Sequence, residues 1–250
     1  MMQWLEQNRL ILNSEKTKVI NFKITNSRNN SSSKFVVGED EVEPCSTVKF
    51  LGVHIDSRLK FIPHIDAVCK KLSSGIFVLR CLAKFTDTDV LMAAYYGLIY
   101  PFLTYAVEIW GHECVRTSFV FKMQKRAIRA IFRKPCQFSC KSLFSDHNIL
   151  TFPSIYILNT VLYVHKNLSR FTQNRSYHQY SLRRNNNILV QSHRTTFFQK
   201  HLDYNGVQLF NSLPEELKLE ENPRRFGNGV RRLLLSGCFY SVRDFLSPPG

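Results

Sequence analysis

The change in hydrophobic spacing at Pro63 constrains the fold of this 250-residue chain more than any other feature. Before it, apolar and polar residues alternate over short segments, which predicts strands at Thr17–Ile24, Phe35–Val37 and Thr47–Ile55. After it, apolar residues recur at steps of three or four, which predicts a helix with Pro63 in its first turn: Ile65, Val68, Leu72, Ile76, Leu79 and Leu82.

The same spacing predicts further helices along the rest of the chain. Thr86 or Thr88 caps the next helix, which Pro101 kinks or divides. Three more are expected at residues 117–134, 153–170 and 226–235, the last ended by Gly237, with a capped helical turn at 211–218. We therefore expect an α+β fold, predominantly α, with short antiparallel strands followed by a helical body.

The charge of the chain points to a polyanionic partner. Its 34 Lys and Arg against 19 Asp and Glu give a net charge of +15. The excess is concentrated in the second half, and no acidic residue lies between Asp146 and Asp203. Such a field attracts nucleic acid or, less often, an anionic membrane.

No segment of the sequence predicts export or membrane insertion. The first residues lack the apolar run of a signal peptide, and seven scattered cysteines without disulfide spacing indicate a reducing compartment. The apolar stretch Val90–Trp110 has about the length of a membrane span, but Pro101 and Glu108 interrupt it, which favours a buried helix. We expect a nuclear or cytoplasmic protein that is not secreted and has no membrane partner.

The segment Arg116–Lys134 carries the sharpest pattern of charge. On a helix, one stripe holds Lys122, Arg126, Arg129 and Arg133, with Lys125 at its edge, and no acidic residue interrupts it. The neighbouring apolar face is expected to hold Phe119, Met123, Ala127, Ala130 and Ile131. Such a stripe suits non-specific contact with nucleic-acid phosphates, whereas a merely solvated face usually mixes both signs.

Several motifs, in order, resemble one family. WLEQNRLILNSEKTKVINF and VKFLGVHIDSRLKFIPHIDAVCKKL are similar to the end of the palm of non-LTR, LINE-type (jockey-like) retrotransposon reverse transcriptases. YYGLIYPFLTYAVEIWG and VFKMQKRAIRAIF resemble the region connected to the thumb. YNGVQLFNSLPEELK and YSVRDFL resemble the C-terminal tail. The resemblance implies a palm remnant at 1–60, a helical thumb-like region at 61–135 and a basic helical region at 136–250.

The resemblance also implies roles for individual residues. Asn13, Lys16 and Thr17 match an N-x-x-K-T element whose lysine lies near the phosphates of the incoming nucleotide. Phe50, Leu51 and Gly52 match the F-L-G turn that resembles the primer grip, and Gln124, Lys125 and Arg126 match the Q-K-R of the thumb region. From the residues alone, Lys16 is equally well a surface lysine, Phe50 and Leu51 are core residues, and Gly52 permits a bulge.

One departure from the family concerns catalysis. A polymerase needs paired aspartates to hold two Mg²⁺ ions, and in this family they lie in an Ala-Asp-Asp turn upstream of the part that Trp4–Leu12 matches. These 250 residues contain no Asp-Asp pair, and Asp87 and Asp89, beside two threonines, are typical of helix capping. The expected activity is therefore nucleic-acid backbone binding without polymerisation, with no catalytic residue and no cofactor in this chain.

A zinc site is a weaker alternative. Cys136, Cys140 and His147, with Cys114 or His112, supply four ligand types that zinc prefers, but their spacing does not match a compact knuckle. Free core thiols are the favoured interpretation, so no metal site is expected.

Three functional hypotheses remain open from sequence. The first is a piece of a reverse transcriptase that binds the RNA or DNA backbone. The second is part of a complete reverse transcriptase whose catalytic half lies either on another polypeptide, its protein partner, or in an upstream exon. The third is a structural or interaction protein recruited by a host, in which the basic surface has no role.

Overall fold

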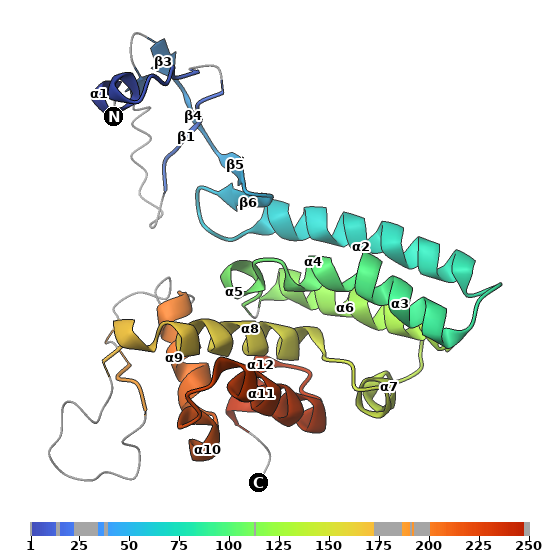
Figure 1. The fold of residues 1–250 in the computed structure, drawn as a ribbon. Helices are drawn as coiled ribbons and strands as arrows, with labels where there is room; N and C mark the ends of the chain where they lie inside the picture. The colour runs from blue at the N-terminus through green and yellow to red at the C-terminus, as the bar shows by residue number, and fades with distance from the viewer. Residues whose placement is uncertain are drawn as a thin grey trace, which may run out of the picture. The chain divides into compact units, whose positions relative to one another are not determined.

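A computed structural model of the chain describes residues 2–13, 16–22, 35–37, 40–112, 114–172, 187–190, 192 and 201–247 (Figure 1). The chain divides into two compact units, Met1–Asp66 and Ala67–Gly250. The first unit holds all the strands described and the second is helical, so the expected α+β, predominantly α fold class is confirmed.

The first unit consists of one short helix and short strands. Helix α1 (Met2–Gln7) precedes β1 (Val19–Ile20), β2 (Phe35–Val37), β3 (Asp40–Val42), β4 (Pro44–Cys45), β5 (Thr47–Phe50) and β6 (Val53–Asp56). The strands pair two by two: β2 with β3 and β5 with β6 are antiparallel, as expected. The pairing of β1 with β4 is parallel, which departs from the antiparallel expectation, and the chain between them contains the β2–β3 hairpin.

The predicted single strand at Thr47–Ile55 is wrong, because the chain reverses in its middle. Leu51 and Gly52 both have positive φ, at 45° and 85°, and they form the two-residue turn between β5 and β6. Such a turn matches the twist of an antiparallel pair, so an alternating segment that looks continuous in sequence becomes a tight hairpin.

The second unit begins with helices close to those expected. Helix α2 (Ile62–Leu82) spans the boundary between the units and carries Pro63 in its first turn, as predicted. Helix α3 (Thr88–Leu98) is capped by Asp87, whose carboxylate accepts a hydrogen bond from the Val90 N–H, rather than by Thr86 or Thr88. Pro101 lies in the first turn of α4 (Tyr100–Thr104), so the predicted helix is divided between α3 and α4, as expected. A second break at Ala106, whose φ is 50°, separates α4 from α5 (Val107–Trp110). None of the helices in the described ranges combines the length and apolar character needed to cross a membrane.

Helix α8 (Phe152–Lys166) forms the centre of the helical unit. It is capped by Thr151, and it contacts α4, α5, α9, α11 and α12 as well as α6 (Val115–Ile131). In Figure 1 it lies between α6 on one side and α11 on the other. Most residues from 152 to 165 are buried, because α8 is apolar around most of its circumference.

In the C-terminal part, α9, α11 and α12 pack against α8, and α7 and α10 pack against α11. Helix α7 (Lys141–Asp146), the 3₁₀ turn Leu168–Arg170 (η1), α9 (Leu202–Asn211), α10 (Glu215–Lys218), α11 (Pro223–Gly237) and α12 (Val242–Leu246) complete the unit. The helices α7, α9 and α12 were not predicted. Gly237 was expected to end α11, but the left-handed residue that ends it is Cys238, with φ at 43°.

Candidate nucleic-acid interface

Helix α6 carries the basic stripe predicted from sequence. It begins after Cys114, whose backbone N–H donates to the Thr117 hydroxyl at 2.9 Å. It ends at Phe132, and the positive φ of Arg133 (50°) turns the chain away ahead of Pro135. The helix therefore presents Lys122, Lys125, Arg126 and Arg129 from regular geometry, and Arg133 from the turn that follows it.

The packed face of α6 differs from the predicted one. Its buried members are Thr117, Val120, Phe121, Gln124, Ala127, Ile128 and Ile131. The prediction that Phe119 lies on this face is wrong: 47% of it is exposed, and the ammonium of Lys122 lies 4.9 Å from the centre of its ring. Met123 is only half-buried. The predicted apolar face lay too close to the cations on the helix. It included Phe119 and Met123, whereas Val120 and Gln124 are the residues that are buried.

Gln124 joins three helices inside this core. It is fully buried, and its amide nitrogen donates to the Tyr95 hydroxyl at 2.9 Å and to the Leu150 carbonyl at 2.8 Å. Its amide oxygen accepts from the Phe152 N–H at 2.7 Å. The glutamine of the Q-K-R triplet is therefore a core residue that fixes α6 against α3 and the start of α8, while the two residues after it face outward.

Three cations of the stripe are exposed to solvent: Lys122, Arg126 and Arg133. Lys122 and Arg126 lie on the exposed side of α6, and Arg126 is within 3.6 Å of the Met123 sulfur. Neither forms an ion pair with a carboxylate among the described residues. Their charges are therefore available to an anion in solution.

Lys125 lies between two aromatic rings. Its ammonium is 4.6 Å from the centre of the Phe121 ring and 5.5 Å from that of Tyr240. Burial lowers the pKa of Lys125, and the positive charges of Arg129 and Lys122 lower it further, while Cys140 acts in the opposite direction. The rings hold the ammonium in one place on the edge of the stripe.

Arg129 and Arg133 are bound to main-chain carbonyls. Arg129 is half-buried and donates from Nε to the Phe138 carbonyl at 2.9 Å. Arg133 donates from Nε to the Ala83 carbonyl at 3.1 Å and from Nη2 to the Thr86 carbonyl. Arg129, which the sequence placed on the stripe beside the apolar face, is therefore partly packed against the segment that follows α6. A neutral carbonyl does not cancel the charge of a guanidinium, so both arginines still contribute to the positive field of the stripe.

Lys16 lies in the other unit of the chain. The Asn13 side chain accepts from the Lys16 N–H at 2.9 Å, and the Thr17 hydroxyl donates to the Asn13 carbonyl at 2.8 Å. The N-x-x-K-T element is thus a turn that leaves the Lys16 side chain exposed. Its two middle residues lie outside the described ranges.

Phe50, Leu51 and Gly52 form the tip of the β5–β6 hairpin. Phe50 is 60% exposed and Leu51 is 75% exposed, so the expectation that they are core residues is wrong. Gly52 sits in the turn rather than in a bulge. The alternation of apolar and polar residues predicted a continuous strand with Phe50 on its packed side. Phe50 instead ends a two-stranded hairpin, where most of its side chain is exposed.

The candidate zinc ligands are not gathered into one site. His147 stacks on Phe132 with ring centres 4.1 Å apart, Cys136 is exposed, and buried Cys140 has its sulfur 3.6 Å from the Lys125 carbonyl. Burial raises the pKa of the Cys140 thiol, which disfavours the thiolate that zinc binds. Within the described ranges, no three His, Cys, Asp or Glu side chains lie close enough to hold a metal ion.

Comparison with known proteins adds evidence independent of this geometry. Over 151 residues, or 58% of this chain, the sequence is 29% identical to the "Probable RNA-directed DNA polymerase from transposon BS" of Drosophila melanogaster. Part of the chain resembles a transposon reverse transcriptase. The resemblance predicted from the motifs is thereby confirmed, although the aligned part makes up only 15% of that polymerase. No protein-family model and no solved structure matches the chain.

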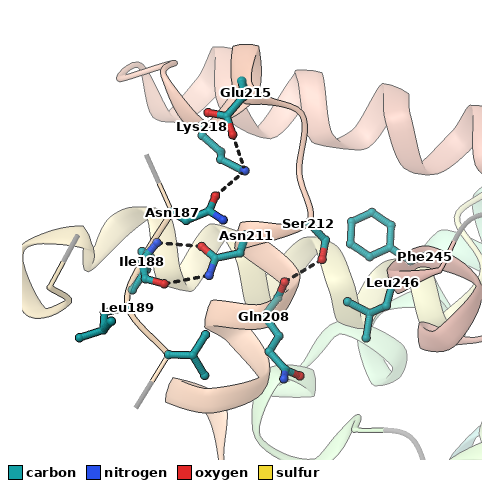
Figure 2. A pocket seen from close by; sticks show the side chains of 11 residues that line it. Asn187, Ile188, Leu189, Gln208, Asn211, Ser212, Glu215, Lys218, Phe245 and Leu246 are labelled. Atoms are coloured by element: carbon teal, nitrogen blue, oxygen red, sulfur yellow. Dashed lines mark hydrogen bonds and ion pairs between the residues drawn. The ribbon is translucent and has the colours of Figure 1, made fainter. Parts of the chain in front are cut away.

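The tail motif YNGVQLFNSLPEELK lines a pocket of about 840 Å³ (Figure 2). The Asn211 amide pairs with both backbone groups of Ile188, accepting from its N–H and donating to its carbonyl, each at 2.8 Å. Lys218 is almost wholly buried, and its ammonium donates to Asn187 at 2.8 Å and to Glu215 at 2.9 Å. Because all of these hydrogen bonds join residues of this chain, the motif holds residues 187–190 against α9 and α10.

Sequence reasoning missed the basic face of α11 and the core role of Gln124. Arg224 and Arg225 look like an isolated surface pair in the sequence, yet Arg231 and Arg232 repeat the pair seven residues later on the same helix. That repeat was a readable signal, because positions seven apart lie on nearly the same side of a helix. For Gln124, the apolar residues three and four positions to either side gave a weaker indication of burial.

Proposed function

We propose that this chain is part of a non-LTR, LINE-type retrotransposon reverse transcriptase and binds the RNA or DNA backbone through the basic stripe of α6. One observation carries the proposal: an acid-free face of a packed helix presents Lys122, Lys125, Arg126 and Arg129, and the turn that follows the helix adds Arg133. The similarity of part of the chain to a transposon polymerase supports the same class of partner.

The contacts within the stripe favour binding to phosphates. Arg129 and Arg133 each have N–H groups beyond those that carbonyls accept, since a guanidinium has five. Because these side chains are already held in place, less rotamer entropy is lost when a phosphate binds. Lys122 and Arg126 supply exposed cations at the N-terminal end of the stripe, so a nucleic-acid backbone would contact both side chains held by carbonyls and side chains that move more freely.

We also propose that these 250 residues do not polymerise DNA by themselves. No two aspartates are adjacent in the sequence, and the described residues do not fit a Mg²⁺ site, since no three His, Cys, Asp or Glu side chains lie together. In a complete polymerase the two Mg²⁺ ions would be held by aspartates of an upstream protein half, which is the partner we propose. The roles of Lys16 as a phosphate-proximal residue and of Phe50–Gly52 as a primer grip stay predictions of the resemblance. A nucleic-acid partner is consistent with a nuclear or cytoplasmic location.

Primer extension tests the catalytic part of the proposal. Purified protein with Mg²⁺, primed RNA template and deoxynucleotides should give no product above a protein-free control. Extension that persists through repurification and disappears in Lys16→Ala would show that the chain is catalytically complete.

The salt dependence of binding tests the stripe. Replacing Lys122 and Arg126 together with Gln removes two exposed cations and leaves the buried face of α6 intact. For every phosphate that the variant no longer binds, the slope of log K against log salt concentration should flatten by about 0.7 to 0.9. The effect should be the same for unrelated sequences, because backbone binding carries no base information.

The matched control replaces Lys70 of α2 and Lys166 of α8, both exposed, with Gln. It removes the same total charge from elsewhere on the helical unit. If the control flattens the slope as much as the stripe variant, the overall field of the protein causes binding and the stripe has no specific role.

A further inference from the structure

Helix α11 has a second basic face that the proposed function does not use. Phe226, Val230 and Leu234 are buried on one side of it, and Arg224, Arg225, Arg231 and Arg232 occupy the opposite arc. The helix contains no acidic residue. Among the described residues, none of these four guanidinium groups forms an ion pair with a carboxylate.

The helix holds these arginines at fixed spacing. The Asn222 side chain accepts from the N–H groups of Arg224 and Arg225 at 2.9 and 3.2 Å, and Pro223 occupies the first helical position. Arg231 and Arg232 follow two turns later, about 10 Å further along the axis. Two pairs of cations are thus presented on one rigid edge.

Tyr96 of α3 lies beside this edge. Burial raises the pKa of Tyr96 while the nearby positive charge of Arg231 lowers it, and 41% of Tyr96 is exposed. The ring makes edge contacts with Tyr95 and Tyr100, at centre distances of 5.2 and 5.3 Å. Because Tyr95 is fully buried, these contacts fix an exposed aromatic ring next to the arginines.

We propose that Tyr96 and the arginine face of α11 form a second nucleic-acid site, specific for a single strand of RNA or DNA. The arginines bind successive phosphates, and an unpaired base stacks on the Tyr96 ring. The proposal rests on the proposed function, since it assumes that nucleic acid is the partner, but it uses residues of α3 and α11 rather than of α6.

The aromatic ring is the reason to expect a single strand. A duplex offers phosphates to the arginines but keeps its bases stacked on one another, whereas a single strand offers both groups at once. An anionic membrane would be matched by arginines alone, but the residue beside Arg231 is a tyrosine with a polar hydroxyl, not an exposed aliphatic side chain that could enter a lipid layer.

Three probes separate these contributions: a thymidine homopolymer strand, an abasic strand of the same length and the matching duplex. Each is titrated by fluorescence anisotropy against the full chain. Tyr96→Leu should weaken binding of the homopolymer by about 5-fold to 150-fold, the range expected when one base–aromatic stack is removed. It should leave binding of the abasic strand and the duplex unchanged. Tyr96→Phe, which keeps the ring, should retain most of the affinity and confirms that the fold tolerates change at this position.

The arginines are tested through salt dependence. Replacing Arg224, Arg225 and Arg232 with Gln should flatten the slope for the single strand by about 0.7 for every phosphate that is no longer bound. The control replaces Lys70, Arg80 and Lys166, three exposed cations of α2 and α8, with Gln and should keep the wild-type slope.

The outcomes distinguish this site from the stripe on α6. If Tyr96→Leu weakens the abasic strand equally, or the α11 variant keeps the wild-type slope while the α6 variant does not, the second site is refuted and the proposed function stands. If neither the α6 variant nor the α11 variant differs from its control, both proposals fail.

Discussion

The buried amide of Gln124 gives the sharpest test of how the helical unit is held together. Replacing Gln124 with Leu keeps the volume but leaves the Phe152 N–H and the Leu150 carbonyl without a partner. The Phe152 N–H belongs to the first turn of α8, where no carbonyl of the helix is available to it. Each buried group left unpaired costs about 1 to 3 kcal/mol, so the free energy of unfolding should fall by about 2 to 6 kcal/mol.

Urea unfolding followed by tryptophan fluorescence measures this decrease. Trp110 is fully buried and stacks on Phe152 with ring centres 5.7 Å apart, so it reports on the core in a Trp4→Phe background. The matched control is Tyr95→Phe, which removes only one acceptor and should cost about 1 kcal/mol. A Gln124→Leu midpoint no lower than that of Tyr95→Phe would refute the reasoning.

Three further predictions follow from packing and burial. Gly206→Ala should destabilise the protein by about 1 to 3 kcal/mol, because the added Cβ would lie 2.8 Å from a methyl group of Val164 on α8. Gly97→Ala, which has open space around it, should stabilise the protein by about 0.5 to 1 kcal/mol. Thermal unfolding of the two variants distinguishes these effects. Burial raises the pKa of Tyr156 and Tyr240 to about 12, above the ordinary value near 10. The stability that this burial contributes is therefore fully present below pH 10 and should be lost as the pH rises toward 12. Ultraviolet absorbance of phenolate, recorded during a pH titration, would contradict this if both tyrosines ionised near pH 10 while the protein stayed folded. Amides of the β5–β6 hairpin should exchange before those of α8, since a two-stranded sheet is marginal alone and α8 is buried on most sides; equal protection in hydrogen-exchange mass spectrometry would oppose it.

Local patterns predicted the helices well where periodicity was regular. The apolar positions from Ile65 to Leu79 are buried on α2 as expected, and Pro101 breaks the chain where its missing N–H requires. The pattern failed at Leu51, because a non-glycine residue with positive φ is not visible in a strand-like alternation. It failed again at the end of α11, where Cys238 rather than a glycine takes the left-handed position.

The candidate site was predictable in composition but not in its contacts. The angular spacing on α6 correctly grouped Lys122 and Arg126 on one exposed side. It could not show that Arg133 bonds to carbonyls 47 and 50 residues earlier in the chain, or that Arg129 bonds to Phe138, because those partners are brought close only by tertiary packing. The same limit hid the contact between Tyr96 and Arg231 from sequence reasoning.

The most direct test of the central claim is a lysine footprint of the protein bound to nucleic acid. Acylation of the free and the bound chain, followed by mass spectrometry, compares Lys122 of the stripe with Lys70 of α2, both exposed. Backbone binding by α6 predicts that Lys122 is protected by RNA or DNA at low salt, that protection disappears at high salt, and that Lys70 reacts equally in both states. Equal protection of both lysines, or none at Lys122 under saturating nucleic acid, would contradict it.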